Sequence, residues 1–188
     1  MNLLEKLING HTLTSEEFND LFENYQNYNI DDDFLLQYAD RILWSAVFRY
    51  YPLSEEMLYY TADRIVDNIH RLAISMYQKL SEGFMEQHSL KLLWPFLSVN
   101  QKMSEDFIIR NADKIDFAYL PYNQKISITA LEKTMKADNV NWRALSRSYP
   151  LTNEFILEFF KYLDTDLLRF NKALNPSDDV KLLLELNN

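Results

Sequence analysis

The side chains best suited to catalysis or metal binding are few in this sequence, and they stand far apart. The three histidines are His11, His70 and His88, and no two of them are four residues apart, the spacing at which one helix presents a pair of zinc ligands. Cysteine is absent, as are a glycine-rich phosphate loop and a G-x-S-x-G motif. We therefore predict a chain with no catalytic residue, no cofactor and no metal ion, whose histidines lie on the surface or in a groove.

A run of three aspartates, Asp31 to Asp33, could supply carboxylate oxygens to a divalent cation. Successive residues do not converge on one ion without a special loop, and the glycine that bends the loop of an EF-hand is missing here. The run is better explained as the start of a helix, where carboxylates accept hydrogen bonds from backbone N–H groups and meet the positive end of the helix dipole.

Negative charge is concentrated at the beginning of the chain. The formal net charge is −9, and residues 1–67 hold 13 acids and four bases, so they account for the whole surplus. A surface of this kind would steer a basic partner electrostatically. The residues that we predict to contact such a partner are Glu16, Glu17, Asp20, Glu23, Asp31, Asp32, Asp33, Glu55 and Glu56. The alternative is that these acids only keep the surface solvated.

The aromatic content, 14% of the residues with 12 tyrosines, could suit a protein that stacks nucleic-acid bases. Such proteins also need a basic groove, because neutralising phosphates supplies much of their affinity. An isoelectric point near 4.8 argues against direct nucleic-acid binding. Most of the aromatic residues are better explained as core residues of a repeat.

The elements that must position these residues are predicted to be helices. Two glycines in 188 residues are too few for many tight hairpins. The sequence has no apolar stretch long enough to span a membrane, and residues 1–8 lack a signal-peptide pattern. Together with the absence of cysteine, these features predict a cytoplasmic protein that does not enter a membrane.

A tandem repeat of about 23 residues is visible in the sequence. The segments 39–42, 62–65 and 112–115 read Ala-Asp-Arg/Lys-Ile, and each begins nine residues after an apolar residue. Extending this register places repeat starts at Ile30, Leu53, Leu80, Met103, Ile126, Leu151 and Leu174. The spacings from Leu53 to Leu80 and from Ile126 to Leu151 are longer than the others. They predict insertions in the inter-helix turns near Asp67-Asn68 and Asp138-Asn139.

Each repeat start has the residue pattern of a helix N-terminus. A side chain able to cap a helix follows every start: Asp31, Ser54, Ser81, Ser104, Ser127, Thr152 and Asn175. In the last copy Pro176 occupies the predicted first helical position. Apolar residues five positions after the starts, such as Leu35 and Ile108, predict a hydrophobic staple. The residues before them, Phe34, Met57, Phe84, Phe107 and Phe155, are expected to point inward.

A second helix follows in each repeat, beginning near Trp44, Trp94, Phe117 and Trp142, with an apolar residue three positions on. Helices this short are unstable alone in water, so neighbouring pairs must share a core. We predict an all-α fold, a right-handed α-solenoid of helix-turn-helix repeats forming one continuous domain. Residues 1–29 are the N-terminal capping helices, residues 30–173 six repeats, and residues 174–188 the C-terminal capping helix.

This repeat unit resembles the short helical repeats of proteins from bacteriophages and large DNA viruses. The clearest copies are residues 80–102 and 103–125, and the resemblance covers about residues 30 to 175. The copy at Ile126 departs from the pattern, because Ile128, Thr129 and Ala130 replace the expected acids and phenylalanine. The resemblance implies an accessory or host-interacting role, including antagonism of bacterial defence systems such as CRISPR nucleases, and it transfers no active site.

The predicted function is therefore that of a non-enzymatic protein-binding module, a viral inhibitor or modulator of a host protein that could itself be a basic nucleic-acid-binding protein. One alternative is an acidic nucleic-acid mimic that fills the DNA or RNA channel of its target. Another is a structural or assembly protein of the virion. If the acidic surface is not the contact surface, the groove lined by the second helices is the next candidate.

Overall fold

The computed structural model describes residues 1–117, 120, 127, 130, 133–134 and 142–187, and its regular elements are all helical. The α-helices are α1 (Leu3–Ile8), α2 (Ser15–Glu23), α3 (Asp32–Gln37), α4 (Trp44–Tyr50), α5 (Glu55–Thr61), α6 (Asn68–Tyr77), α7 (Glu82–Gln87), α8 (Trp94–Asn100), α9 (Glu105–Arg110), α11 (Trp142–Ser148), α12 (Asn153–Phe159), α13 (Thr165–Phe170) and α14 (Asp178–Leu186). Short 3₁₀ helices are η1 (Tyr25–Tyr28), η2 (Ala62–Arg64), η3 (Ser89–Lys91) and η5 (Phe160–Tyr162). The predicted repeat start at Ile126 and the insertion at Asp138-Asn139 lie outside the described residues.

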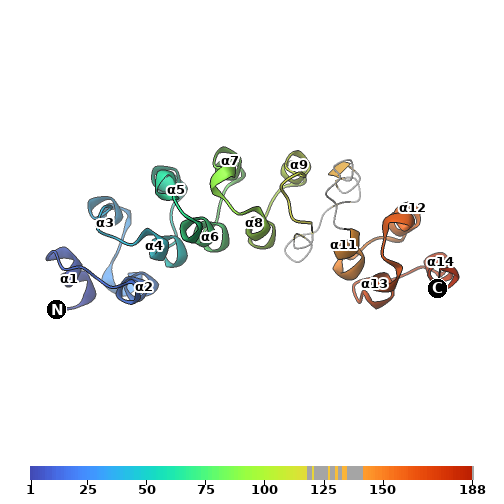
Figure 1. The fold of residues 1–188 in the computed structure, drawn as a ribbon, viewed down its shortest axis with the longest axis horizontal. Coiled ribbons are helices and arrows are strands. Elements are labelled where there is room, and N and C mark those ends of the chain that lie inside the picture. The colour runs from blue at the N-terminus through green and yellow to red at the C-terminus, as the bar shows by residue number, and fades with distance from the viewer. Residues whose placement is uncertain (118–119, 121–126, 128–129, 131–132, 135–141, 188) are drawn as a thin grey trace. The chain divides into compact units, whose positions relative to one another are not determined.

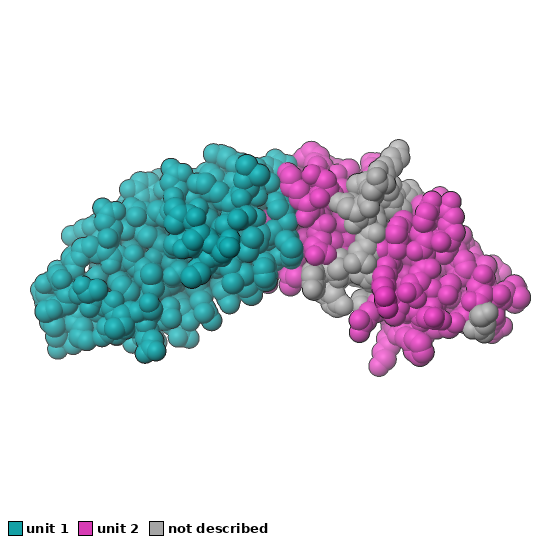
Figure 2. All heavy atoms as spheres, in the orientation of Figure 1, with its two compact units in different colours: residues 1–96 teal, residues 97–188 magenta. Residues whose placement is uncertain are grey.

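The chain forms two compact units, residues 1–96 and residues 97–188, which Figure 2 shows in different colours. In the first unit, α3, α5 and α7 form one layer and α2, α4 and α6 form the other (Figure 1). Helix α4 packs against both α2 and α6. We call the layer of α3, α5 and α7 the first-helix layer, and the layer of α2, α4 and α6 the second-helix layer. In the second unit, α11 packs on α13, and α12 packs on α14.

The predicted caps at the starts of the first helices are confirmed. Asp31, Ser54, Ser81, Ser104 and Thr152 each accept a hydrogen bond from the backbone N–H three residues further on. Acids such as Glu55 and Glu105 occupy the first turns that follow. At the start of each of these short helices, the cap therefore satisfies one of the four backbone N–H groups that have no partner within the helix.

The predicted start of the last helix is wrong. Neither Asn175 caps it nor Pro176 begins it; the cap is Ser177, whose hydroxyl accepts from the N–H of Val180, and α14 begins at Asp178. The N–H of Ser177 donates to Asn153 Oδ1 at 2.8 Å, which fixes the serine in place. Asp178 and Asp179 then lie in the first turn, where the helix dipole favours carboxylates.

The four extra residues of the repeat that starts at Leu53 lie mostly within a helix and not in the turn. Helix α6 has 10 residues, whereas its counterpart α4 has seven. Asp67 caps α6 by accepting from the N–H of His70 at 2.8 Å, and Ala73 and Ile74 are buried on its inner face. The insertion therefore adds almost a full turn to α6.

The core follows the repeat register. Buried residues include the starts Ile30, Leu53, Leu80, Met103 and Leu151 and the staple positions Leu35, Leu58, Met85, Ile108 and Ile156. Met57, Phe84, Phe107 and Phe155 point inward as predicted, and Phe84 is covered by Tyr59 of the preceding pair, with 5.2 Å between ring centroids. Phe34, in the first such pair, is only half-buried and packs on Tyr38 of its own helix.

Buried polar side chains join successive second helices. Ser75, Ser98 and Ser146 each accept a hydrogen bond from a backbone N–H 18 residues further on, at 2.9–3.0 Å. Gln78 Nε2 donates to the carbonyls of Phe48 and Tyr51, and Asn171 Nδ2 donates to the carbonyls of Ser146 and Tyr149, all at 2.8–2.9 Å. The same contacts therefore occur in both units.

The Ala-Asp-Arg/Lys-Ile motif also joins neighbouring pairs. Arg64 donates to the carbonyl of Ala39 at 3.0 Å and to Asp40 at 3.2 Å. Lys91 makes the equivalent contacts, to the carbonyl of Ala62 at 2.9 Å and to Asp63 at 3.0 Å. At these two junctions the basic residue of one pair thus holds the alanine and the aspartate of the pair before it.

Candidate functional site

The acids predicted to contact a partner lie in two places of the first unit. Asp31, Asp32, Asp33, Glu55 and Glu56 lie at the N-terminal ends of α3 and α5, which we call the cap edge. Glu16, Glu17, Asp20 and Glu23 lie on α2, in the second-helix layer. The structure does not gather all nine at one point, but Asp32 and Glu55 each accept a hydrogen bond from the cap serine of the next first helix.

At the cap edge, carboxylates link one first helix to the next. Asp32 accepts from the hydroxyls of Tyr51 and Ser54, both at 3.0 Å, and Glu55 accepts from the hydroxyl of Ser81. Burial and the neighbouring Asp32 carboxylate raise the pKa of Tyr51, so this phenol stays a hydrogen-bond donor. In the second unit Glu105 accepts from both the N–H and the hydroxyl of Ser127, at 2.7 and 2.9 Å.

On α2, two of the four predicted acids also have partners within the unit. Glu17 accepts from Lys6 at 2.7 Å and from the N–H of Thr14 at 2.9 Å, and these contacts hold the pKa of its carboxyl below the ordinary value. Asp20 accepts from the side chain of Asn24 at 2.9 Å. The positions of these two carboxylates are therefore set by the fold.

Four of the predicted acids are exposed and accept no hydrogen bond within residues 1–96: Glu16, Glu23, Asp33 and Glu56. They are the members of the predicted set most available to another molecule.

Among the residues that the structure describes, no group of three histidine or acidic side chains is arranged to hold a metal ion. None of the helices in the described ranges is both long and apolar enough to cross a membrane.

The histidines occupy different surroundings. His11 is exposed, whereas His70 and His88 are half-buried. His88 packs against Phe84, with 4.5 Å between ring centroids, and against Tyr59 at 5.7 Å. Burial, with a smaller effect of Lys91, lowers the pKa of His88 below its ordinary value of 6.5.

This shift predicts a pH dependence of stability. Because the unfolded chain binds a proton at position 88 more readily than the folded chain, His88 lowers stability as the pH falls through 6.5, and the loss levels off below the folded-state pKa. Proton NMR titration should give His88 a pKa below 6.5, and His88→Gln should weaken the pH dependence of unfolding between pH 7 and 5. A pKa for His88 at or above 6.5 would contradict the packing described here.

A second surface lies in the second-helix layer, and sequence reasoning identified its layer but not its residues. A groove of about 380 Å³ is lined by α2, α4 and α6 and the residue before α4. Its walls are Ser15, Asn19, Leu43, Ser45, Arg49, Ile69, Leu72, Ala73 and Tyr77. The sequence signal for this groove is a second apolar stripe on α6, at Ile69, Leu72 and Tyr77, beside the stripe that enters the core.

Comparison with protein-family models, with curated proteins and with solved structures finds no match to this chain.

Proposed function

We propose that this chain is a non-enzymatic protein-binding module, a solenoid of tandem helix pairs that presents its surface to a protein partner. The observation that carries the proposal is the recurrence of the same inter-helix hydrogen bonds. Ser75, Ser98 and Ser146 all accept from an N–H 18 residues away, as expected for a stack whose units contact their neighbours in one way. The resemblance to repeat proteins of phages and large DNA viruses supports a viral inhibitor or modulator of a host protein, acting in the host cytoplasm.

The use of the buried polar side chains supports binding over catalysis. Gln78 and Asn171 join second helices, and Thr61 and Asn111 donate to carbonyls in their own helix turns. These contacts satisfy backbone groups and hold the helices in place.

An acidic nucleic-acid mimic is the second candidate, favoured by the exposed acids Glu16, Glu23, Asp33 and Glu56. A mimic of phosphates would bind through charge, and its affinity would collapse as salt screens the two surfaces. A protein-binding module that docks through apolar contacts would instead lose association rate at high salt but keep most of its affinity.

The first test is affinity purification of the tagged full chain from cells that express it, with mass spectrometry of the captured proteins. The proposal predicts a saturable protein partner that is retained after nuclease treatment. Capture of nucleic acid alone, or of no saturable partner, would overturn it.

The second test separates steering from mimicry. Replacing Glu16, Glu23 and Glu56 by Gln and Asp33 by Asn should slow association with the captured partner several-fold at low salt and leave dissociation unchanged. The matched control changes the same number of exposed acids in the second unit: Glu154, Glu158, Asp179 and Glu185. Equal effects of both sets would indicate net charge alone, and a loss of affinity above about a hundredfold with the first set alone would favour the mimic.

A further inference from the structure

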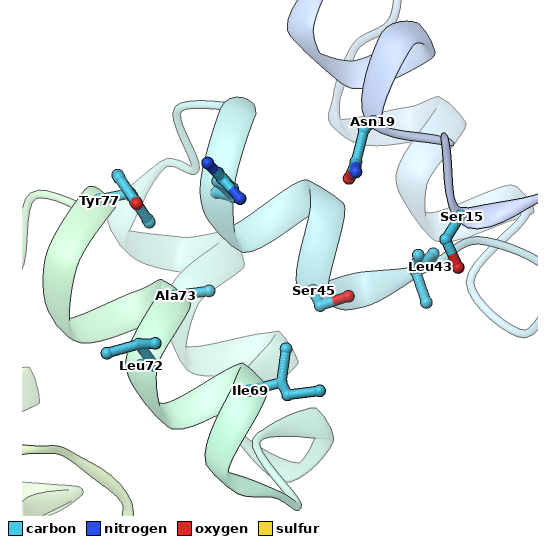
Figure 3. A pocket seen from close by; sticks show the side chains of 9 residues that line it. Ser15, Asn19, Leu43, Ser45, Ile69, Leu72, Ala73 and Tyr77 are labelled. Carbon is cyan, nitrogen blue, oxygen red and sulfur yellow. The ribbon is translucent and has the colours of Figure 1, made fainter. Parts of the chain in front are cut away.

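The groove between α2, α4 and α6 has an apolar wall that the fold leaves uncovered. Ile69, Leu72 and Tyr77 of α6 remain 65%, 36% and 48% exposed. Figure 3 shows these side chains along α6, facing Ser45 of α4 and, beyond it, Ser15 and Asn19 of α2. From Ile69 to Tyr77 the helix rises about 12 Å, enough to contact a segment of roughly two helical turns. Exposed apolar groups gathered in a groove with polar side chains on the far wall are typical of a peptide-binding site.

One cation, Arg49, lines this groove. Its guanidinium carbon lies 5.1 Å from the ring centroid of Tyr50 and 5.4 Å from that of Tyr77. Cation–π contact with two rings favours this position of the guanidinium, whose N–H groups can donate to a further acceptor. Within residues 1–96 no carboxylate lies within ion-pair distance of Arg49.

The other arginines of this unit are used by the fold. Arg64 binds Asp40 and the carbonyl of Ala39, and Arg41 and Arg71 donate to the carbonyls of Leu7 and Leu90. Lysines Lys6 and Lys91 are paired with Glu17 and Asp63. Arg49 therefore has no carboxylate partner within residues 1–96, although the unit has more acids than bases. Together with the apolar wall beside it, Arg49 is complementary to an apolar segment that carries a negative charge.

Resting on the proposed protein-binding function, we infer that this groove binds a segment of the partner protein that packs apolar side chains on Ile69 and Leu72 and places a single carboxylate on Arg49. An aspartate or glutamate matches the planar donor pair of the guanidinium. The acids elsewhere on the unit repel further negative charge, so the segment is selected for one carboxylate among apolar residues. A nucleic-acid strand fits poorly, because one cation cannot neutralise a run of phosphates.

The second unit has a groove in its second helices that also combines an arginine with apolar side chains, although a second cation, Lys172, lines it as well. Arg147 of α11 and Leu167 and Phe170 of α13 line it, and Phe170 is 80% exposed. Arg147 stands four residues before the repeat start Leu151, as Arg49 stands four residues before Leu53. An arginine on one second helix beside an exposed apolar side chain on the next thus occurs in each unit considered by itself.

The test uses a phage-displayed library of random 12-residue peptides selected on the full chain, followed by fluorescence anisotropy with the enriched peptides. We expect peptides with two apolar residues three or four positions apart and one Asp or Glu. Arg49→Gln and Ile69→Ser should each weaken their binding at least tenfold. Matched controls at exposed positions outside the groove, Lys79→Gln and Leu90→Ser, should change it less than twofold. Circular dichroism verifies that each variant is folded.

A charge exchange makes the test specific. The substitution Arg49→Glu should abolish binding of the acidic peptide. The Arg49→Glu variant should instead bind the peptide in which that acid is replaced by Lys. Enrichment of basic peptides, absence of any enriched peptide, or binding indifferent to Arg49 would overturn the inference. So would Arg49-dependent binding of a twelve-nucleotide oligothymidine or of phosphatidylglycerol vesicles in place of peptide. If the captured partner binds the wild-type chain and Arg49→Gln equally well, the groove inference fails while the protein-binding function stands.

Discussion

Replacing Phe107 by alanine should lower the free energy of unfolding by about 3 to 5 kcal/mol, as for other buried aromatic side chains. The side chain is fully buried, at the inward position that follows the Ser104 cap and precedes Ile108. Truncation would remove apolar contacts and leave a cavity that the short helix α9 cannot collapse to fill. Urea titration followed by circular dichroism at 222 nm measures this loss.

The matched variant in the same helix is Glu105→Ala. Glu105 is exposed, but it accepts two hydrogen bonds from Ser127 and does more than contact the helix dipole. We expect a loss of about 1 kcal/mol, well below that of Phe107→Ala. Equal losses at the two positions would show that the inward and outward positions of the repeat are misassigned.

Replacing Gln78 by alanine should cost about 3 kcal/mol, although glutamine is a polar residue. Its amide donates to the carbonyls of Phe48 and Tyr51 at 2.8 Å and accepts from the N–H of Leu53 at 3.1 Å. Without the amide, these buried backbone groups lose their partner, and each unsatisfied group costs about 1–3 kcal/mol before relaxation.

Gln78→Met separates the hydrogen bonds from packing, because methionine keeps most of the volume but donates no hydrogen bond. A loss with Gln78→Met close to that with Gln78→Ala would assign the effect to the hydrogen bonds. Asn171→Ala should give a similar loss in the second unit, where Asn171 holds Ser146 and Tyr149 in the same way. Losses below about 1 kcal/mol at both positions would contradict the role of these amides in joining helix pairs.

The helix starts could be predicted because capping is local. A serine such as Ser54 or Ser104 bonds to an N–H only three residues away, and the apolar residues around it follow from the same short spacing. The end of the chain shows the limit of this reasoning. Asn175 and Ser177 are both suitable caps, and the choice of Ser177 depends on its contact with Asn153, 24 residues earlier in the chain.

The contacts between helix pairs could not be predicted from local patterns, although the residues that make them were visible. Arg64 and Asp40 belong to copies of one motif, but their ion pair spans 24 residues and becomes evident only when the pairs are stacked.

The candidate surfaces also depend on contacts that local patterns do not predict. Asp32 and Glu55 were predicted as partner contacts, and the structure shows that they also bind the next pair's cap. The role of Arg49 could not be predicted from the sequence, because its separation from carboxylates is a property of the fold.

Photocrosslinking in cells tests most directly the claim that this chain binds a protein through its second-helix layer. The photoreactive residue p-benzoylphenylalanine would replace Tyr77, which lines the groove, and in a matched variant Tyr60, an exposed tyrosine of α5 in the first-helix layer. We predict a discrete protein adduct from position 77, identified by mass spectrometry, that is absent from position 60 and is lost when Arg49→Gln is added. No protein adduct from position 77, or the same adducts from both positions, would contradict the account.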